Sequence, residues 1–400
     1  MFKVSNKKIH HLERRDAMNH LIIKNGNVYT DGSFKKADII IKDGIIKEIT
    51  SDTGNLEDFE VFDVNEQNIV PGFIDVHTHG AVNVDVNGAT AEDLDKISYF
   101  FALQGTTSWL CSILTDTKEQ TLWCIDQYNK HKNQECNGAK LMGIHLEGPF
   151  LAPEYKGAMP EHLLIEPDME LIKEYQTAAN GDVKYITVSP EVEGIPDCID
   201  DLKELGIVVA IGHSGADYDI AMKSINNGAT SATHTFNAMK LMHQHFPAIA
   251  GAVLESDIYC EAICDGRHLH PGIVRLLIKT KGIDKVVAVT DSIMATGLPD
   301  GNYKLGVNDV VVVDGDAKLA NGGARAGSTL TTINALKNLM EFTKRPLEEV
   351  IVLLTKNPAT MLGLYDKIGS ISVGKYADLV VLNKDNDVIA TFVQGKRIMK

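Results

Sequence analysis

The middle of the chain alternates β-prone segments with longer segments of helical periodicity, and this alternation occurs eight times. The β-prone segments comprise residues 72–79, 106–113, 141–147, 184–190, 207–213, 230–235, 259–265 and 285–291. Helical segments separate them, for example residues 91–104, 169–179 and 217–227. A strand followed by a helix, repeated eight times, predicts an α/β fold with a parallel (β/α)8 barrel of the TIM type.

The first β-prone segment ends in two histidines, His77 and His79, which stand two positions apart. Side chains two apart in a strand share a face, so both imidazoles can point at one metal ion. A His-x-His pair alone is a weak signal, because two histidines near a turn are often incidental. The pair gains weight from the residue types that end four other β-prone segments.

Side chains that bind divalent transition metals end these further segments. Glu147 ends the third, His213 the fifth, His234 the sixth and Asp291 the eighth. In a (β/α)8 barrel the carboxyl ends of all strands meet at one face, and active sites lie there. The sequence therefore predicts a metal-dependent active site built from residues that are far apart in the chain.

Each of these residues also has a structural interpretation. Taken singly, His213 or His234 fits a histidine that is satisfied within the core, and Glu147 fits a structural carboxylate. A charged residue at the end of a buried strand requires a partner, so metal ligation is the favoured interpretation. We expect His145, on the same strand as Glu147, to support the ligands or to line the pocket and not to bind the metal directly.

Both ends of the chain have the pattern of short strands. Residues 18–70 and 368–400 show alternating apolar runs, and Asp43-Gly44 between two such runs marks a hairpin. We predict one small β-sandwich domain, completed by both chain ends, beside a barrel domain at residues 71–367. Residues 1–17 are basic without apolar periodicity and are predicted to be a disordered extension, with a targeting arm or an upstream start as alternatives.

The charge and the cysteine content narrow the setting in which this chain works. A formal net charge of -15 argues against nucleic acid or an anionic membrane as a partner. The six cysteines include no Cys-x-x-Cys pair, and the sequence has neither a signal-peptide pattern nor an apolar run long enough to cross a bilayer. We therefore expect a cytoplasmic protein with reduced thiols.

The candidate ligands stand within longer sequence motifs. Residues 71–80 read Pro-Gly-Phe-Ile-Asp-Val-His-Thr-His-Gly, residues 145–149 His-Leu-Glu-Gly-Pro, and residues 234–239 His-Thr-Phe-Asn-Ala-Met. Others lie at residues 212–214, 265–268, 290–292, 326–330 and 357–359. From about residue 21 to its end, the chain resembles the amidohydrolase superfamily, and more narrowly its N-acetylglucosamine-6-phosphate deacetylase branch. The first motif belongs to the wider superfamily, and the next two are specific to the branch.

The resemblance implies roles for the candidate ligands. Glu147, His213 and His234 would hold one divalent metal ion, and Asp291 would be the general acid and base. Members of the branch that keep the first histidine pair can hold a second ion, so one or two ions per subunit are implied here. Zinc is the expected metal, with iron, cobalt or manganese as alternatives, because such ligands discriminate little among these ions.

The resemblance also implies a pocket for an amino-sugar phosphate. The predicted substrate-binding residues are Ala158, Met159, Asn237, Ala238, His245, His268, Arg325, Ala326 and Gly327. Two of them depart from the branch: His245 stands where many relatives have an arginine that reaches into the neighbouring subunit's phosphate site, and Met159 where many have a histidine. Arg325 and Arg267 are candidates to compensate for the arginine, and an ordinary surface arginine is the alternative for each.

The chemistry implied is hydrolysis of an amide. A bound metal acidifies water and polarises a carbonyl, while Asp291 takes the proton of the water and delivers it to the departing nitrogen. We expect an enzyme of amino-sugar catabolism that converts N-acetylglucosamine 6-phosphate to glucosamine 6-phosphate and acetate, and the resemblance implies a homodimer. The alternatives are N-acetylgalactosamine 6-phosphate or another N-acyl substrate, and a non-catalytic scaffold that retains the fold.

Overall fold

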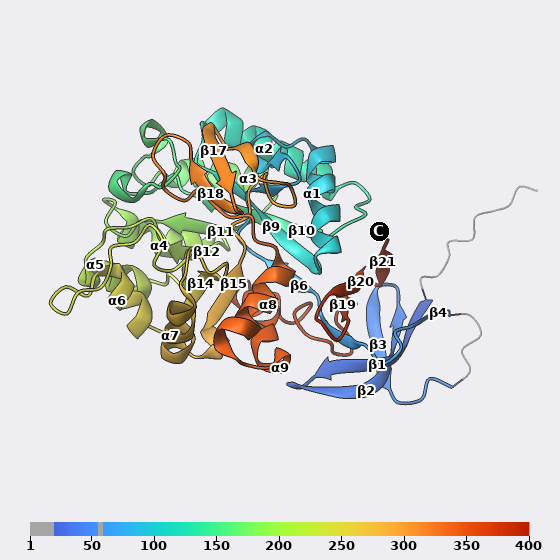
Figure 1. The fold of residues 1–400 in the computed structure, drawn as a ribbon. Coiled ribbons are helices and arrows are strands. Elements are labelled where there is room, and N and C mark those ends of the chain that lie inside the picture. The colour runs from blue at the N-terminus through green and yellow to red at the C-terminus, as the bar shows by residue number, and fades with distance from the viewer. Residues whose placement is uncertain (1–19, 55–58, 400) are drawn as a thin grey trace, which may run out of the picture.

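The computed structural model of the protein describes residues 20–54 and 59–399, and the extension predicted at residues 1–17 lies outside them. The described chain forms a barrel of alternating strands and helices beside a β domain (Figure 1). Among these residues, no helix has both the length and the apolar character that a membrane span requires.

Eight parallel strands form the barrel wall, in the order β15-β14-β13-β12-β11-β10-β9-β6. Their bounds are β6 Phe73–Asp75, β9 Thr106–Leu114, β10 Lys140–Glu147, β11 Val183–Val188, β12 Val208–Ile211, β13 Ser231–Ala232, β14 Tyr259–Ile263 and β15 Val286–Val289. Each predicted β-prone segment overlaps one of these strands, so the predicted (β/α)8 barrel is confirmed. Every residue of β9 and of β15 is buried, as expected for strands covered on both faces.

A helix follows each barrel strand and covers the outside of the wall (Figure 1). These helices are α1 Ala91–Leu103, α2 Lys118–Lys132, α3 Met169–Ala178, α4 Ile195–Glu204, α5 Tyr218–Asn226, α6 Ala248–Glu255, α7 Pro271–Lys281 and α8 Thr332–Thr343. Shorter helical pieces are α9 Leu347–Val350, α10 Lys356–Met361 and the 3-10 turns η1 Val86–Gly88, η2 Pro153–Tyr155, η3 Glu161–Leu163, η4 Ile283–Lys285 and η5 Ile351–Leu354. Local sequence fixes some boundaries: Thr90 caps α1 by accepting the backbone N–H of Asp93, whose carboxylate accepts the backbone N–H of Thr90.

The first and last barrel strands, β6 and β15, meet just beyond their carboxyl ends. The backbone N–H of Asp291 donates to the carbonyl of His77 (2.9 Å), and the backbone N–H of His79 donates to the carbonyl of Ser292 (2.7 Å). Thr78 and Ser292 form a parallel bridge between these bonds. The closure of the barrel therefore places the histidine pair of the first strand beside the aspartate of the eighth.

The β domain is an eight-stranded sheet built from both ends of the described chain. Its order is β21-β20-β19-β5-β1-β2-β3, and β4 pairs with β1. The strands are β1 His20–Thr30, β2 Ser33–Lys42, β3 Ile45–Thr50, β4 Glu60–Asp63, β5 Asn68–Pro71, β19 Leu379–Leu382, β20 Val388–Val393 and β21 Lys396–Ile398. The predicted Asp43-Gly44 turn joins β2 to β3 and has left-handed backbone at both residues (φ 51° and 74°). The sheet has a core of its own, in which Ile23, Ile39 and Phe392 are fully buried.

A three-stranded antiparallel sheet lies between β15 and α8, in a region where the sequence analysis predicts no strand. Its strands are β16 Gly301–Leu305, β17 Asn308–Val313 and β18 Asp316–Leu319, and a small ribbon of β7 Gly80–Ala81 and β8 Val84–Asp85 follows β6. Leu305, Val310 and Ala317 belong to one buried apolar cluster with Leu114, the last residue of β9, and Met159, in the loop after β10. The inserted sheet therefore covers part of the face where the strand ends meet.

Candidate metal centre and active site

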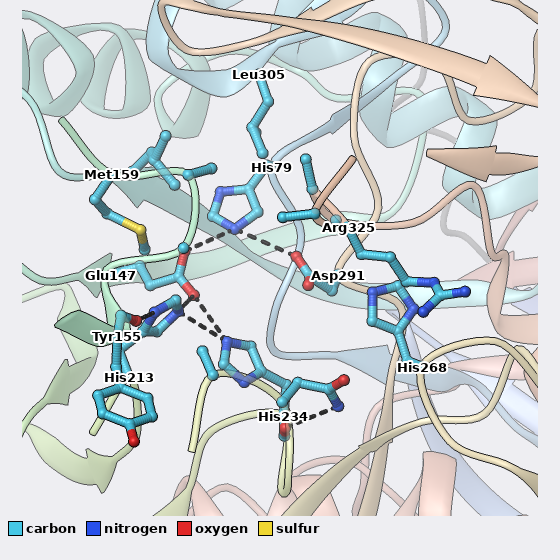
Figure 2. Close-up of a pocket in the computed structure, with 18 of the residues that line it drawn as sticks. His79, Glu147, Tyr155, Met159, His213, His234, His268, Asp291, Leu305 and Arg325 are labelled. Atoms are coloured by element: carbon cyan, nitrogen blue, oxygen red, sulfur yellow. Dashed lines mark hydrogen bonds and ion pairs between the residues drawn. The ribbon is translucent and has the colours of Figure 1, made fainter. Parts of the chain in front are cut away.

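Six side chains predicted to bind metal or to move a proton converge at the carboxyl ends of the barrel strands, and Figure 2 shows five of them around one centre. His77 and His79 follow β6, Glu147 is the last residue of β10, His213 lies two residues after β12, His234 two after β13 and Asp291 two after β15. All six are buried. The barrel thus brings together residues from five different strand ends.

The first group of ligand atoms comprises His77, His79 and Glu147. The two Nε2 atoms of the histidines are 3.2 Å apart. His77 Nε2 lies 3.2 Å from Glu147 Oε1, and His79 Nε2 lies 3.1 Å from Glu147 Oε2. Asp291 Oδ1 is next to this group, 3.5 Å from His79 Nε2 and 3.7 Å from His77 Nε2. Three ligand-type atoms therefore surround one point, with a carboxylate beside it.

The second group comprises Glu147, His213 and His234. Glu147 Oε1 lies 3.2 Å from His213 Nε2 and 3.5 Å from His234 Nε2, and these two nitrogens are 2.9 Å apart. In each group the ligand-type atoms lie within 4.8 Å of one another. Because Glu147 belongs to both groups, they form one continuous cluster that can hold one or two ions.

Three of these residues leave their strands through left-handed backbone. The φ angles are 46° at His213, 28° at His234 and 50° at Asp291. Non-glycine residues rarely adopt such angles, and when they do the strain often marks a functional site. The turn directs each side chain away from the path of the strand and into the cluster (Figure 2).

Backbone carbonyls orient two of the imidazoles. Nδ1–H of His213 donates to the carbonyl of Tyr155 (2.7 Å), and Nδ1–H of His79 donates to the carbonyl of Ser112 (3.1 Å). With the proton held at Nδ1, the lone pair of Nε2 faces the cluster. This second hydrogen bond is typical of histidines that bind a metal.

The cluster has a strong preference for positive charge. Burial opposes protonation of His77, but the carboxylates of Glu147, Glu261 and Asp291 outweigh it and raise the pKa of His77 well above its usual value. Burial also favours the neutral acid at Glu147, yet His77 and His79 outweigh that effect and hold the pKa of Glu147 well below its usual value. A cation among these carboxylates is therefore stabilised, whether it is a proton on histidine or a metal ion.

His145 lies beside the cluster with both ring nitrogens engaged elsewhere. Its Nδ1 is 2.8 Å from Ser112 Oγ, and its Nε2 is 2.9 Å from Thr187 Oγ1. Burial lowers the pKa of His145 well below its usual value, and the charge of His77 adds to this effect. A neutral His145 therefore packs against the His77 ring, with centroids 4.6 Å apart, and supports it from outside the group.

Comparison with known proteins assigns the family. The sequence profile of the amidohydrolase family matches residues 68–398. The chain belongs to the amidohydrolase family. The family resemblance predicted from the strand-end motifs is thereby confirmed.

Individual relatives match this amidohydrolase over 82% to 94% of its length. The N-acetylglucosamine-6-phosphate deacetylase of Bacillus subtilis (strain 168) is 34% identical over 382 residues, which are 94% of this chain and 96% of that protein. The N-acetylgalactosamine-6-phosphate deacetylase of Escherichia coli O157:H7 is 32% identical over 333 residues, 82% of this chain and 87% of that protein. A crystal structure of N-acetylglucosamine-6-phosphate deacetylase from Pasteurella multocida has a TM-score of 0.89 at 31% identity, covering 94% of this chain and 99% of that one.

The charge balance of the amidohydrolase cluster fits a divalent cation. Asp75, Glu147, Glu261 and Asp291 place four buried carboxylates at or near the strand ends. Within residues 20–54 and 59–399, none of the four forms an ion pair with lysine or arginine. Buried carboxylates need a compensating charge, and imidazole nitrogens with carboxylate oxygens are a donor set that zinc, iron, cobalt and manganese accept.

A cavity of about 470 Å³ opens over the cluster (Figure 2). Eight of the nine predicted substrate-binding residues line it: Ala158, Met159, Asn237, Ala238, His268, Arg325, Ala326 and Gly327. Other lining residues are Leu114, Glu154, Tyr155, Gly157, Leu305, Gly323 and Ala324, which the sequence prediction does not include. The wall therefore combines the end of β9 and the loops after β10, β13 and β14 with the inserted sheet and the loop that follows it.

The basic residues predicted as candidates for phosphate binding lie in different places. Arg325 lines the cavity, where its guanidinium pairs with Asp316 (Nε to Oδ1 3.0 Å). His245 is exposed, and Arg267 donates to the carbonyl of Asp314; neither residue is part of the cavity wall. Arg325 is thus the predicted arginine that can reach a ligand in this cavity.

The sequence prediction does not include two buried carboxylates, Glu261 and Asp75. Glu261 accepts a hydrogen bond from Nδ1–H of His77 (3.0 Å), and Asp75 accepts one from the hydroxyl of Thr290 (2.6 Å). The signal for Glu261 is its charge within the otherwise apolar strand β14. Asp75 stands two residues before His77 in the first motif, where its carboxylate reaches the strand that carries Asp291.

Proposed function

We propose that this amidohydrolase is a divalent-metal-dependent deacetylase that converts N-acetylglucosamine 6-phosphate to glucosamine 6-phosphate and acetate. The observation that carries the proposal is the position of Asp291 beside two histidine and glutamate groups that share Glu147. A carboxylate that can move a proton and a cluster that can hold a cation are what hydrolysis of an amide requires. The names of the relatives supply the substrate.

The metal would be held by Glu147, His213 and His234, with His77 and His79 offering a second position on the other side of Glu147. We propose zinc as the ion, one or two per subunit, with iron, cobalt and manganese as alternatives. When bound, the metal acidifies a water molecule and polarises the substrate carbonyl.

Asp291 is proposed to move the proton. Its backbone N–H donates to the carbonyl of His77 (2.9 Å), and its own carbonyl accepts the backbone N–H of Ser328 (2.7 Å). These bonds hold the residue while its carboxylate faces both the cluster and the cavity. From there Asp291 can take a proton from the attacking water and deliver it to the nitrogen of the departing sugar.

The cavity wall offers separate contacts for the two ends of the substrate. Met159 has no hydrogen-bond donor and lies in an apolar cluster with Leu114 and Leu305, so we propose that this side contacts the acetyl methyl group. Arg325 and His268 lie across the cavity and are proposed to contact the phosphate and the sugar (Figure 2). Met159 cannot polarise the carbonyl, so a metal held by Glu147, His213 and His234 would supply that polarisation.

Three further features belong to the proposal. We propose a homodimer, in which the exposed His245 of one subunit contributes to the cavity of its partner. We propose that the enzyme acts in the cytoplasm. N-acetylgalactosamine 6-phosphate is a second candidate substrate, because the relative from Escherichia coli O157:H7 carries that name.

The test is acetate release by the zinc-loaded protein from N-acetylglucosamine 6-phosphate, with the galactosamine epimer and unphosphorylated N-acetylglucosamine as parallel substrates. We expect the first to be hydrolysed fastest. Asp291→Asn is the control, and it should abolish turnover while the bound metal remains. Faster hydrolysis of another sugar would change the substrate and keep the chemistry, whereas no release from any of them would leave a protein with the fold but without the activity.

A further inference from the structure

Glu261 is a buried carboxylate in the middle of a barrel strand, outside the set of candidate ligands. It is the central residue of β14, which runs Tyr-Cys-Glu-Ala-Ile, and its side chain is 0% exposed. The isolated charge of such a residue is unfavourable inside an apolar barrel unless it has a defined partner.

One oxygen of this carboxylate contacts both candidate metal-binding groups. Glu261 Oε2 accepts Nδ1–H of His77 at 3.0 Å and the backbone N–H of His234 at 3.0 Å. The backbone carbonyl of Glu261 also accepts the N–H of Thr235 at 2.9 Å. His77 belongs to the first group and His234 to the second, so Glu261 connects the two groups through hydrogen bonds.

These bonds determine how two ligands face the cluster. A proton held at Nδ1 of His77 leaves the lone pair of its Nε2 directed at Glu147, 3.2 Å away. His234 has left-handed backbone (φ 28°), and the bonds from its own N–H and from that of Thr235 hold this turn in place. Loss of Glu261 would free the ring of the first ligand and the backbone of the second.

We propose that Glu261 is a positioning residue that aligns His77 and His234 for metal binding and thereby couples the two groups. The inference rests on the proposed metal centre and adds a residue that neither binds the metal nor contacts the substrate. Outer partners of metal ligands typically contribute 10- to 100-fold to metal affinity.

The Glu261 carboxylate makes these hydrogen bonds through one oxygen, and its second oxygen, Oε1, is buried without a hydrogen-bond partner among the described residues. An apolar replacement would leave Nδ1–H of His77 and the backbone N–H of His234 without an acceptor, so the metal-free protein should lose stability. A purely structural role predicts that loss alone. A positioning role also predicts weaker zinc binding by protein that is still folded.

The experiment measures zinc affinity and thermal stability of the full chain after demetallation, for the native protein, Glu261→Met and Glu261→Gln. We expect folded Glu261→Met to bind zinc about 10- to 100-fold more weakly, and its metal-free melting temperature to fall because two buried donors lose their acceptor. Glu261→Gln keeps a carbonyl oxygen for the two donors, so its loss of affinity is smaller. Asp378→Asn removes another buried carboxylate, immediately before β19, and should leave zinc affinity unchanged.

A double-mutant cycle tests whether Glu261 affects zinc binding through His77. In a His77→Ala background, Glu261→Met should weaken zinc binding by a smaller factor than in the native protein, because one of its two contacts is already lost. Native affinity in Glu261→Met, or an equal loss in Asp378→Asn, would overturn the inference and leave the proposed function intact. If the methionine variant does not fold, unchanged affinity in Glu261→Gln overturns it. A native protein that binds no zinc would overturn both proposals.

Discussion

At the scale of single residues, the cavity is lined by carboxylates of the candidate metal centre and by an arginine whose charge is paired with an acidic side chain. The Arg325 guanidinium lies 3.0 Å and 3.3 Å from the two oxygens of Asp316, and Lys318 also pairs with Asp316 at 3.0 Å. Arg325 lines the cavity, whereas Lys318 does not. Asp316 therefore orients Arg325 for an anion that enters the cavity, and a phosphate would share the guanidinium with it.

The role of Arg325 can be measured by comparing phosphorylated and unphosphorylated substrates. Arg325→Ala should raise KM for the sugar phosphate about 10- to 100-fold, the effect of one lost hydrogen bond to a charged group, and should leave the unphosphorylated sugar unaffected. Lys318→Ala removes a charge from the same carboxylate without altering the cavity wall and serves as the control. Equal changes for both sugars in Arg325→Ala would show that the arginine does not read the phosphate.

At the scale of elements, the carboxyl ends of β6 and β15 are joined by a buried carboxylate. Asp75 accepts the hydroxyl of Thr290 (2.6 Å), the backbone N–H of Thr290 (3.3 Å) and that of His77 (3.4 Å). Burial raises the pKa of Asp75 to about 6, although these donors act in the opposite direction. The junction therefore aligns Asp291, the next residue after Thr290, with the histidine pair.

Thr290→Val tests this junction, because it removes the shortest of these bonds and keeps the shape of the side chain. We expect the free energy of unfolding to fall by about 1–3 kcal/mol, the penalty for a buried group that loses a partner, and turnover to fall with it. The control is Thr391→Val in β20, whose buried hydroxyl donates to the carbonyl of Ala102 (2.7 Å) away from the cluster. Both variants should be less stable in urea, and only Thr290→Val should lose turnover. Full activity in Thr290→Val would contradict the role of the junction.

The same elements show which features the sequence can predict. Alternation of strand and helix predicts all eight barrel strands, because burial on both faces leaves a strong apolar signal. The ends of the strands are less predictable. Residues 230–235 are expected to form one strand, but β13 comprises only Ser231–Ala232, because the chain then turns and places the His234 side chain in the cluster. The sequence analysis does not predict the inserted sheet, although the Asp314-Gly315 pair that joins β17 to β18 is typical of a hairpin turn. Glu261 is missed because its partners are set only when neighbouring strands come together.

At the scale of the whole molecule, the β domain and the barrel are joined at one point by a short, buried connection. β5 ends at Pro71 and β6 begins at Phe73, so only Gly72 separates the two sheets, and its N–H donates to the carbonyl of Asp378 (2.8 Å). The Asp378 carboxylate accepts the backbone N–H of Gln394 (2.7 Å). A titratable group therefore lies buried where the two bodies meet.

This position gives the protein a predictable pH dependence of stability. Burial raises the pKa of Asp378 from 3.8 to about 7, so the folded state binds the proton more tightly than the unfolded chain does. Its contribution is full below pH 4 and is lost as the pH rises to 7, by at most about 1.4 kcal/mol per pH unit. Asp378→Asn should gain stability relative to the native protein across this window in denaturant titrations at pH 4.5 to 8. A difference between the two proteins that stays constant with pH would contradict the assignment.

The inserted sheet separates parts of the molecule that can change independently. Arg325, Ala326 and Gly323 reach the cavity from the segment after β18, whereas the candidate ligands stand on the barrel strands themselves. The sheet is held against the barrel by an apolar cluster in which Leu305 and Val310 pack with Leu114. Ser328, later in this segment, holds the carbonyl of Asp291, so the part that precedes residue 326 is the part that can be lengthened or exchanged to alter which acylated sugar enters without disturbing the hydrolytic centre. For protein engineers, and for divergence by natural selection, this segment is the place where a new preference can arise with the chemistry preserved.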